Sequence, residues 1–213
     1  MIKVVTIDRE YGTGGAEIAA KLARQLGWKL WDQALTSEIA KQAQCAPAEV
    51  ECREERRDPI SHRLFKSFVR GSFEGNINTQ PIEMLDADRI VTLTREIVKR
   101  AAREGNCVIV GRGSACSLQD NPEIFHAFIY APAEEKVRRL KQAGKSREEA
   151  LHLIESVDRD RAAFIKKYFS KQWPDHHLFH IMLNSQIGDE AVIQNILHAI
   201  SLVGEKPATA KAI

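Results

Sequence analysis

The N-terminal segment carries the feature that most restricts the fold, an apolar strand followed at once by a glycine-rich turn and an amphipathic helix. Residues 2–7, IKVVTI, are apolar and largely β-branched, which is typical of a strand. They lead into DREYGTGG, a turn-forming stretch, after which Ile18, Leu22 and Leu26 recur at helical spacing. This order predicts a βα unit, in which ligands bind at the carboxyl end of the strand.

The remainder of the chain repeats this alternation. Further strands are predicted at residues 28–31, 107–111, 125–131 and 178–184. Helices are predicted from Asp32 to about residue 43, at 89–104, from Ala133 to Gly144, from a capping box at Ser146 and Glu149 onward, and at 190–200. Apolar strands separated by helices predict an α/β protein with a parallel sheet covered by helices on both faces.

One segment interrupts the pattern. Residues 45–88 are charged and contain glycines and prolines, so we interpret them as a helical insertion on the core. The chain has 213 residues, which fits one globular domain. We therefore expect a single domain over residues 1–204 and a disordered polar tail at 205–213.

Charge and cysteine usage exclude several classes of function. The 31 basic and 29 acidic residues give a net charge of +2, which does not favour a nucleic-acid or membrane-surface partner. The four cysteines form no CxxC pair, and Cys107 opens an apolar run where a small buried thiol fits. No signal peptide and no apolar run of about 18 residues is visible, so we expect a cytoplasmic protein.

The glycine loop is the first candidate for chemistry. Between a strand and a helix, successive backbone N–H groups and the helix N-terminus converge on a phosphate. The standard loop, GxxxxGK[ST], adds a lysine and a hydroxyl; if Gly14 is the last glycine, Arg9 stands at the first, Gly15 at the lysine and Ala16 at the hydroxyl. The alternative is a tight turn without a ligand. The candidate phosphate-binding residues are Arg9, Gly12, Thr13, Gly14 and Gly15.

Several segments in order resemble the cytidylate kinase-like family. They are IDREYGTGGAEIAAKLARQLGWKLWD, NCVIVGRGSA, FHAFIYAPAEEKVRRL, VDRDRAAFIKKYF and WPDHHLFHIMLN, spread from Val5 to Leu197. The resemblance implies a P-loop kinase fold with a mobile lid, here residues 133–177. It implies transfer of the γ-phosphoryl group of ATP, with Mg²⁺, to CMP or dCMP.

The resemblance also assigns roles to individual residues. Asp32 matches an aspartate that follows the second strand, and Arg112 matches the arginine that faces the CMP site; both are expected to bind the acceptor. Arg159 and Asp160 match the arginine-aspartate of the lid, so the expected catalytic residues are Arg112, Arg159 and Asp160. Arg138 and Arg139 stand where lid arginines face phosphates, but a solvated helix face explains them equally well. Trp173 matches the family without an assigned role.

The loop departs from the family, which leaves alternatives open. The lysine and hydroxyl are missing, and Glu38 stands where true cytidylate kinases have an arginine. A nucleotide-binding regulatory protein that has lost transfer is one alternative, and a kinase for a different small acceptor is another. The insertion would then determine which acceptor binds. Its aromatic residues at near-helical spacing could form either a contact surface of the lid or the interface of a homo-oligomer.

Overall fold

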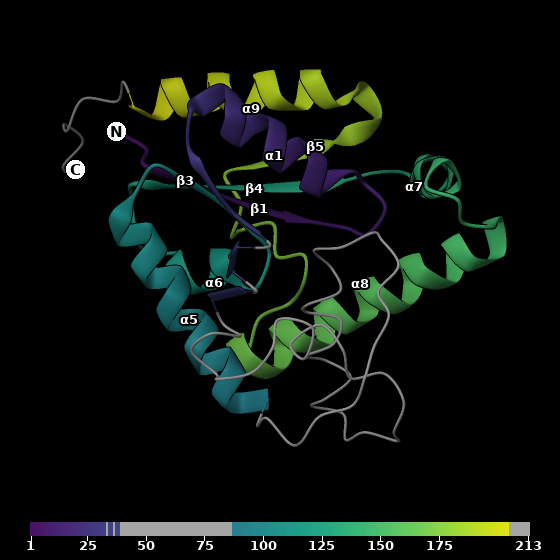
Figure 1. Cartoon of the computed structure of the whole chain (residues 1–213), viewed down its shortest axis with the longest axis horizontal. Coiled ribbons are helices and arrows are strands. Elements are labelled where there is room, and N and C mark those ends of the chain that lie inside the picture. The colour runs from purple at the N-terminus through teal and green to yellow at the C-terminus, as the bar shows by residue number, and fades with distance from the viewer. Residues whose placement is uncertain (33, 36, 39–86, 205–213) are drawn as a thin grey trace, which may run out of the picture.

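The structure, a computed structural model, describes residues 1–32, 34–35, 37–38 and 87–204 (Figure 1). Five parallel strands form one sheet in the order β2-β3-β1-β4-β5. The strands are β1 (Val4–Arg9), β2 (Lys29–Trp31), β3 (Cys107–Val110), β4 (Ile124–Tyr130) and β5 (Ile181–Asn184). The predicted parallel α/β architecture is therefore confirmed. Most of the predicted insertion, residues 45–86, and the tail at 205–213 lie outside the described residues.

Helices cover both faces of the sheet. In Figure 1, α1 (Gly15–Leu26) and α9 (Asp189–Gly204) lie on one face. The other face carries α5 (Ala87–Glu104), α6 (Ser114–Leu118) and α8 (Arg147–Phe169), and α7 (Ala133–Gln142) lies beyond the carboxyl ends of the strands. The α7 helix is thus placed where parallel sheets of this kind bind ligands.

The central strand β1 explains why the sheet is buried on both sides. Alternate residues point to opposite faces of a strand. Val5 and Ile7 pack with α1 and α9, whereas Val4 packs with α5 and α8. All six residues of β1 are buried, including the polar Thr6, Asp8 and Arg9. Burial of Asp8 and Arg9 at the carboxyl end of the central strand marks the position of the candidate site.

The structure differs from the sequence prediction at two connections. The short helix α6, flanked by Gly113, was not predicted, because five residues are too few to show a helical period. Strand β5 begins at Ile181 instead of residue 178. The residues before it form a turn, in which the Leu178 amide donates to the Asp175 carbonyl at 3.0 Å, and Phe179 packs on Phe128 under the sheet.

Two further expectations concern burial and membranes. The Cys107 thiol is buried as predicted, and burial raises its pKa to about 11. Among the described residues, none of the helices is both long and apolar enough to cross a bilayer.

Candidate active site

The glycine loop joins β1 to α1 as predicted. Gly12 and Gly14 have φ angles of 79° and 72°, a region that L side chains rarely adopt, and α1 begins at Gly15. The Thr13 hydroxyl donates to the Glu10 carbonyl at 2.9 Å and fixes the turn. Within the described part of the chain, no side chain caps the start of the helix, and Glu17 is the acidic residue of its first turn.

Arg9 fills the space that a side chain at position 15 would need. A Cβ atom built on Gly15 would lie 2.8 Å from both Cβ and Cγ of Arg9. The Arg9 guanidinium continues across to Gly111, at the end of β3, and the whole residue is buried. Glycine at position 15 therefore makes room for the aliphatic stem of Arg9, and the guanidinium lies at the end of the neighbouring strand β3.

The loop is covered in this structure. Residues 11–15 are all buried. A Cβ atom on Gly12 would meet Cδ1 of Leu140 at 3.1 Å and Cβ of Lys136 at 3.2 Å, and one on Gly14 would collide with the Arg139 guanidinium. Helix α7 thus packs directly on Gly12 and Gly14.

A buried group of charges joins the loop to α7 and α8. Asp158 of α8 accepts the Tyr11 amide at 2.8 Å. Its second carboxylate oxygen lies 3.7 Å from Lys136 Nζ, which also pairs with Glu10 at 3.0 Å. Burial raises the pKa of Asp158, while the charges of Arg161 and Lys136 oppose that rise. We refer to Glu10, Lys136, Asp158 and Arg161 as the inner ion-pair group.

Arg161 supports Arg9 from below the loop. Its Nη1 donates to the Arg9 carbonyl at 2.8 Å and to Asp158 Oδ1 at 3.1 Å. Burial, with a smaller contribution from the Arg9 charge, lowers the pKa of Arg161 to about 10. The guanidinium stays charged at neutral pH, and it holds the backbone of Arg9 through a charge-assisted hydrogen bond.

The three arginines of the predicted lid, Arg138, Arg139 and Arg159, differ in position. Arg139 lies on Gly14, whereas Arg138 is exposed and pairs with Glu135, so the phosphate interpretation fits Arg139 and the solvated-face interpretation fits Arg138. Arg159 is exposed, and its Nη1 lies 4.0 Å from Glu155. Helical geometry turns Asp158 and Arg161 toward the loop and leaves Arg159 on the outer surface of α8.

The candidate acceptor residues follow two adjacent strands. Asp32 comes directly after β2, and Arg112 comes two residues after β3; both are buried. Arg112 has a φ angle of 58°, an uncommon conformation for a residue with a side chain. Oδ1 of Asp32 is buried with no hydrogen-bond partner among the described residues. The structure brings both predicted residues to the carboxyl edge beside the loop, where Asp32 offers an acceptor to a donor group of a ligand.

The end of α8 closes this edge from below. The Phe169 ring lies against Gly113, where a side chain would collide with it. The Arg95 guanidinium lies over the Phe169 ring, with Cζ 4.4 Å from the ring centroid, and it donates to the Tyr168 carbonyl. This arrangement fixes the chain around Arg112 by packing.

Trp173 acquires a role that the sequence did not indicate. Its indole N–H donates to Asp8 Oδ2 at 3.0 Å, and its ring lies edge-on to Phe128. The other carboxylate oxygen of Asp8 accepts the Arg9 amide at 3.0 Å. Trp173 therefore helps to orient a buried carboxylate at the start of the loop.

We expect Trp173→Phe to lower the free energy of unfolding by about 1.5–3 kcal/mol, because the ring packing remains and a hydrogen bond to a charged group is lost. Urea denaturation of the variant and of the wild type measures this difference in the free energy of unfolding. Trp28→Phe is the control, since the described part of the chain gives the Trp28 indole no hydrogen bond, and it should change stability less. Equal effects of the two substitutions would contradict a role for the Asp8 contact.

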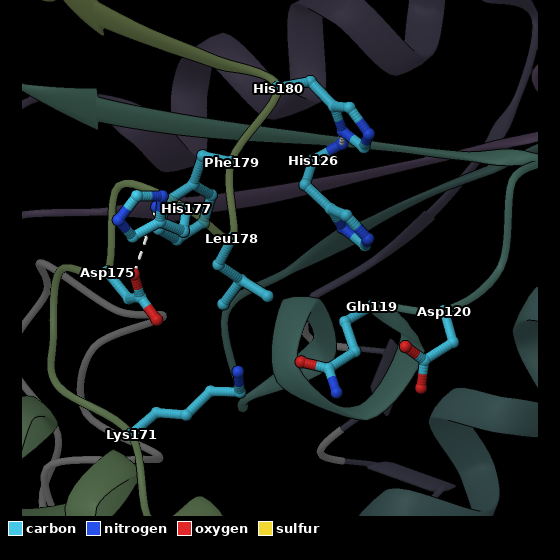
Figure 2. A pocket seen from close by; sticks show the side chains of 9 residues that line it. All are labelled: Gln119, Asp120, His126, Lys171, Asp175, His177, Leu178, Phe179 and His180. Atoms are coloured by element: carbon cyan, nitrogen blue, oxygen red, sulfur yellow. Dashed lines mark hydrogen bonds between the residues drawn. The ribbon is translucent and has the colours of Figure 1, made fainter. Parts of the chain in front are cut away.

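A separate cavity of about 330 Å³ lies between the end of α6 and the segment before β5 (Figure 2). In Figure 2 the His126 ring and the Lys171 ammonium point toward its centre. Burial lowers the pKa of His126 to about 4, so this ring is neutral. The His126 Nδ1 lies 2.6 Å from the Thr6 hydroxyl, and its amide donates to His180. The cavity is lined by residues of both charges and does not adjoin the glycine loop, so it is not the candidate phosphate site.

Fold and loop together define a P-loop kinase-like α/β protein. The chain belongs to the cytidylate kinase-like family, whose model matches residues 4–187. A comparison with curated proteins gave no match.

Two solved structures share the fold. An uncharacterized protein from Eubacterium ventriosum ATCC 27560 has a TM-score of 0.68 at 21% identity, with 94% of this chain and 99% of that chain covered. Shikimate kinase from Acinetobacter baumannii, in complex with shikimate, has a TM-score of 0.52 at 15% identity, with 97% of each chain covered. At these identities the likeness concerns the fold and not the substrate.

Proposed function

We propose that the chain is an ATP-dependent nucleoside monophosphate kinase that acts on CMP or dCMP. The observation that carries the proposal is the position of Arg9, whose buried stem packs against Gly15 of the loop and whose guanidinium lies at Gly111, directly before Arg112. We assign the role of the missing lysine to this guanidinium. Phosphoryl transfer needs positioned phosphates and cations more than covalent participation by protein groups.

In the proposed reaction a phosphate oxygen of CMP attacks the γ-phosphorus of ATP. The bond between the γ-phosphorus and the β,γ-bridging oxygen breaks, which gives CDP and ADP. The loop from Gly12 to Gly15 binds the donor phosphates, and Arg9 and Arg139 balance their charge. Asp32 and Arg112 hold the acceptor. Arg159 and Asp160 stay predicted lid residues, and Arg159 is exposed on α8 in this structure.

In this proposal Mg²⁺ enters the site bound to ATP. Ala16 replaces the hydroxyl that usually reaches the metal, and the Thr13 hydroxyl is turned to the Glu10 carbonyl. Side chains of the loop therefore do not fit a dedicated Mg²⁺ site. Phosphate oxygens are themselves suitable ligands for the ion, so the phosphates of ATP would hold it.

A second candidate function, a nucleotide-binding regulatory protein, is favoured by the closed loop. Lys136 and Arg139, two cations near the glycines, are already paired with protein carboxylates, and α7 packs on Gly12 and Gly14. A kinase for another small acceptor uses the same fold, since the fold alone does not determine the substrate.

The test is transfer from ATP with Mg²⁺ to a panel of nucleoside monophosphates. We expect CMP or dCMP to be phosphorylated, and we expect Arg112→Ala to lower kcat/KM about 10–100-fold, because a charged contact to the acceptor is lost. Arg103→Ala, at an exposed arginine of α5, is the matched control and should leave kcat/KM unchanged. Nucleotide binding without transfer to any acceptor would refute the kinase and favour the regulatory protein.

A further inference from the structure

A second set of ion pairs, the outer ion-pair group, links α7 to the opposite side of the molecule. Arg139 Nη2 lies 2.9 Å from Asp189 Oδ1, at the start of α9. The other oxygen of Asp189 lies 2.8 Å from Lys21 Nζ of α1, and Arg139 Nε lies 2.9 Å from Glu135 on its own helix. Asp189 thereby connects three helices, α7, α1 and α9.

We propose that Asp189 holds the glycine loop closed by pairing with Arg139, and that a polyphosphate must displace this carboxylate before it can bind. The inference rests on the proposed function in so far as the ligand carries several phosphates. It adds the regulation of that site: a carboxylate of the chain competes with the ligand for the same guanidinium.

The position of Arg139 supports this competition. Its guanidinium lies on Gly14, the residue immediately before α1, where an anion bound to the loop would also lie. Nη2 also donates to the Ser185 carbonyl at 3.2 Å, so three protein acceptors share the group. Carboxylates and phosphates bind guanidinium in the same bidentate manner, and one can therefore replace the other.

The two cations of α7 that contact the loop differ in solvent exposure. The side chains of Arg139 and Asp189 are 19% and 20% exposed, so a dissolved anion can reach them. Lys136 of the inner group is 9% exposed, although its partner Glu10 is 26% exposed. The Arg139 guanidinium is thus the more accessible of the two cations.

The titration behaviour of Asp189 agrees with this role. Burial alone would raise its pKa, but hydrogen bonds from Lys21 and Arg139 bring the pKa below its usual value. Asp189 is consequently ionised at neutral pH and keeps both partners. A partly exposed ion pair contributes little free energy, which is suitable for a fastening that a ligand opens.

The first experiment measures hydrogen exchange of the ligand-free protein. Asp189→Asn removes the charge and keeps the shape, and we expect exchange at the amides of residues 12–18 to rise about three- to tenfold relative to amides of β1 and β4. Glu190→Gln is the matched control, because Glu190 is the next residue and contacts Gln25 and Gln194 instead of α7. The control should exchange like the wild type.

The second readout is binding of inorganic tripolyphosphate by calorimetry, for which we expect Kd to fall about three- to tenfold in Asp189→Asn only. Unchanged loop exchange would overturn the proposal, and so would raised exchange with an unchanged Kd. Asp189→Ser, which also suits the start of a helix, replaces Asp189→Asn if that variant folds poorly. Because exchange is measured without nucleotide, it can succeed where phosphoryl transfer fails, and the two proposals are tested separately.

Discussion

Arg161→Leu should lower the free energy of unfolding by about 3 kcal/mol, the cost of breaking a largely buried ion pair. The substitution leaves the Asp158 carboxylate, which is 18% exposed, with Lys136 at 3.7 Å as its remaining cation among the described contacts, and it removes the donor to the Arg9 carbonyl. The measurement is urea denaturation followed by circular dichroism, with the slope m checked for a change in the denatured state.

Arg159→Leu is the matched control for Arg161→Leu. It lies two residues earlier on α8, but its side chain is 58% exposed and its contact to Glu155 is 4.0 Å long. We expect a change within about 0.5 kcal/mol, as for most exposed positions. Similar losses at Arg159 and Arg161 would contradict the assignment of Arg161 to the inner ion-pair group.

The contrast between these neighbours shows what a motif could and could not predict. The sequence DRDR, residues 158–161, drew attention to one turn of α8, but it did not indicate which of its side chains face the loop. That choice depends on the rotation of α8 against β1. The contact between Tyr11 and Asp158 spans 147 residues, and no local pattern contains it.

The sheet was predictable for a physical reason that the inner ion-pair group lacks. Buried parallel strands are continuous apolar runs, and CVIV at β3 is fully buried as its composition requires. The order β2-β3-β1-β4-β5 follows from pairing between strands far apart in the sequence. Runs of apolar residues therefore located the strands, but they did not give their order.

The glycine loop also combines local features that the sequence shows with long-range contacts that it does not. Its glycines and its position before α1 were visible from spacing alone, and so was the absence of a lysine. The compensation was only partly visible, because Arg9 could be placed inside the loop but not against Gly15. The same holds for Trp173, whose indole reaches back 165 residues to Asp8.

The relation between Arg9 and Gly15 leads to the largest expected effect on activity. Arg9→Gly should lower phosphoryl transfer about 100–1000-fold, the usual cost of removing one group that stabilises the transferring charge. Gly15→Lys alone should not raise phosphoryl transfer above that of the wild type, because the Cβ atom of the new lysine would lie 2.8 Å from Cβ and Cγ of Arg9. Overpacking of this kind costs about 1–3 kcal/mol of stability.

Combining Arg9→Gly with Gly15→Lys restores the spacing GxxxxGK and should recover at least about tenfold of the lost kcat/KM, since the second change places a cation in the space that the first vacates. The measurement is a double-mutant cycle on kcat/KM and on urea stability. Arg9→Gly with Gln25→Lys is the control, because Gln25 is exposed on the last turn of α1, far along the helix from the loop, and its effects should add. A double variant no better than Arg9→Gly would show that Arg9 does not stand in for the lysine, whereas recovery would show that one cation, reached from either position, is what this loop requires.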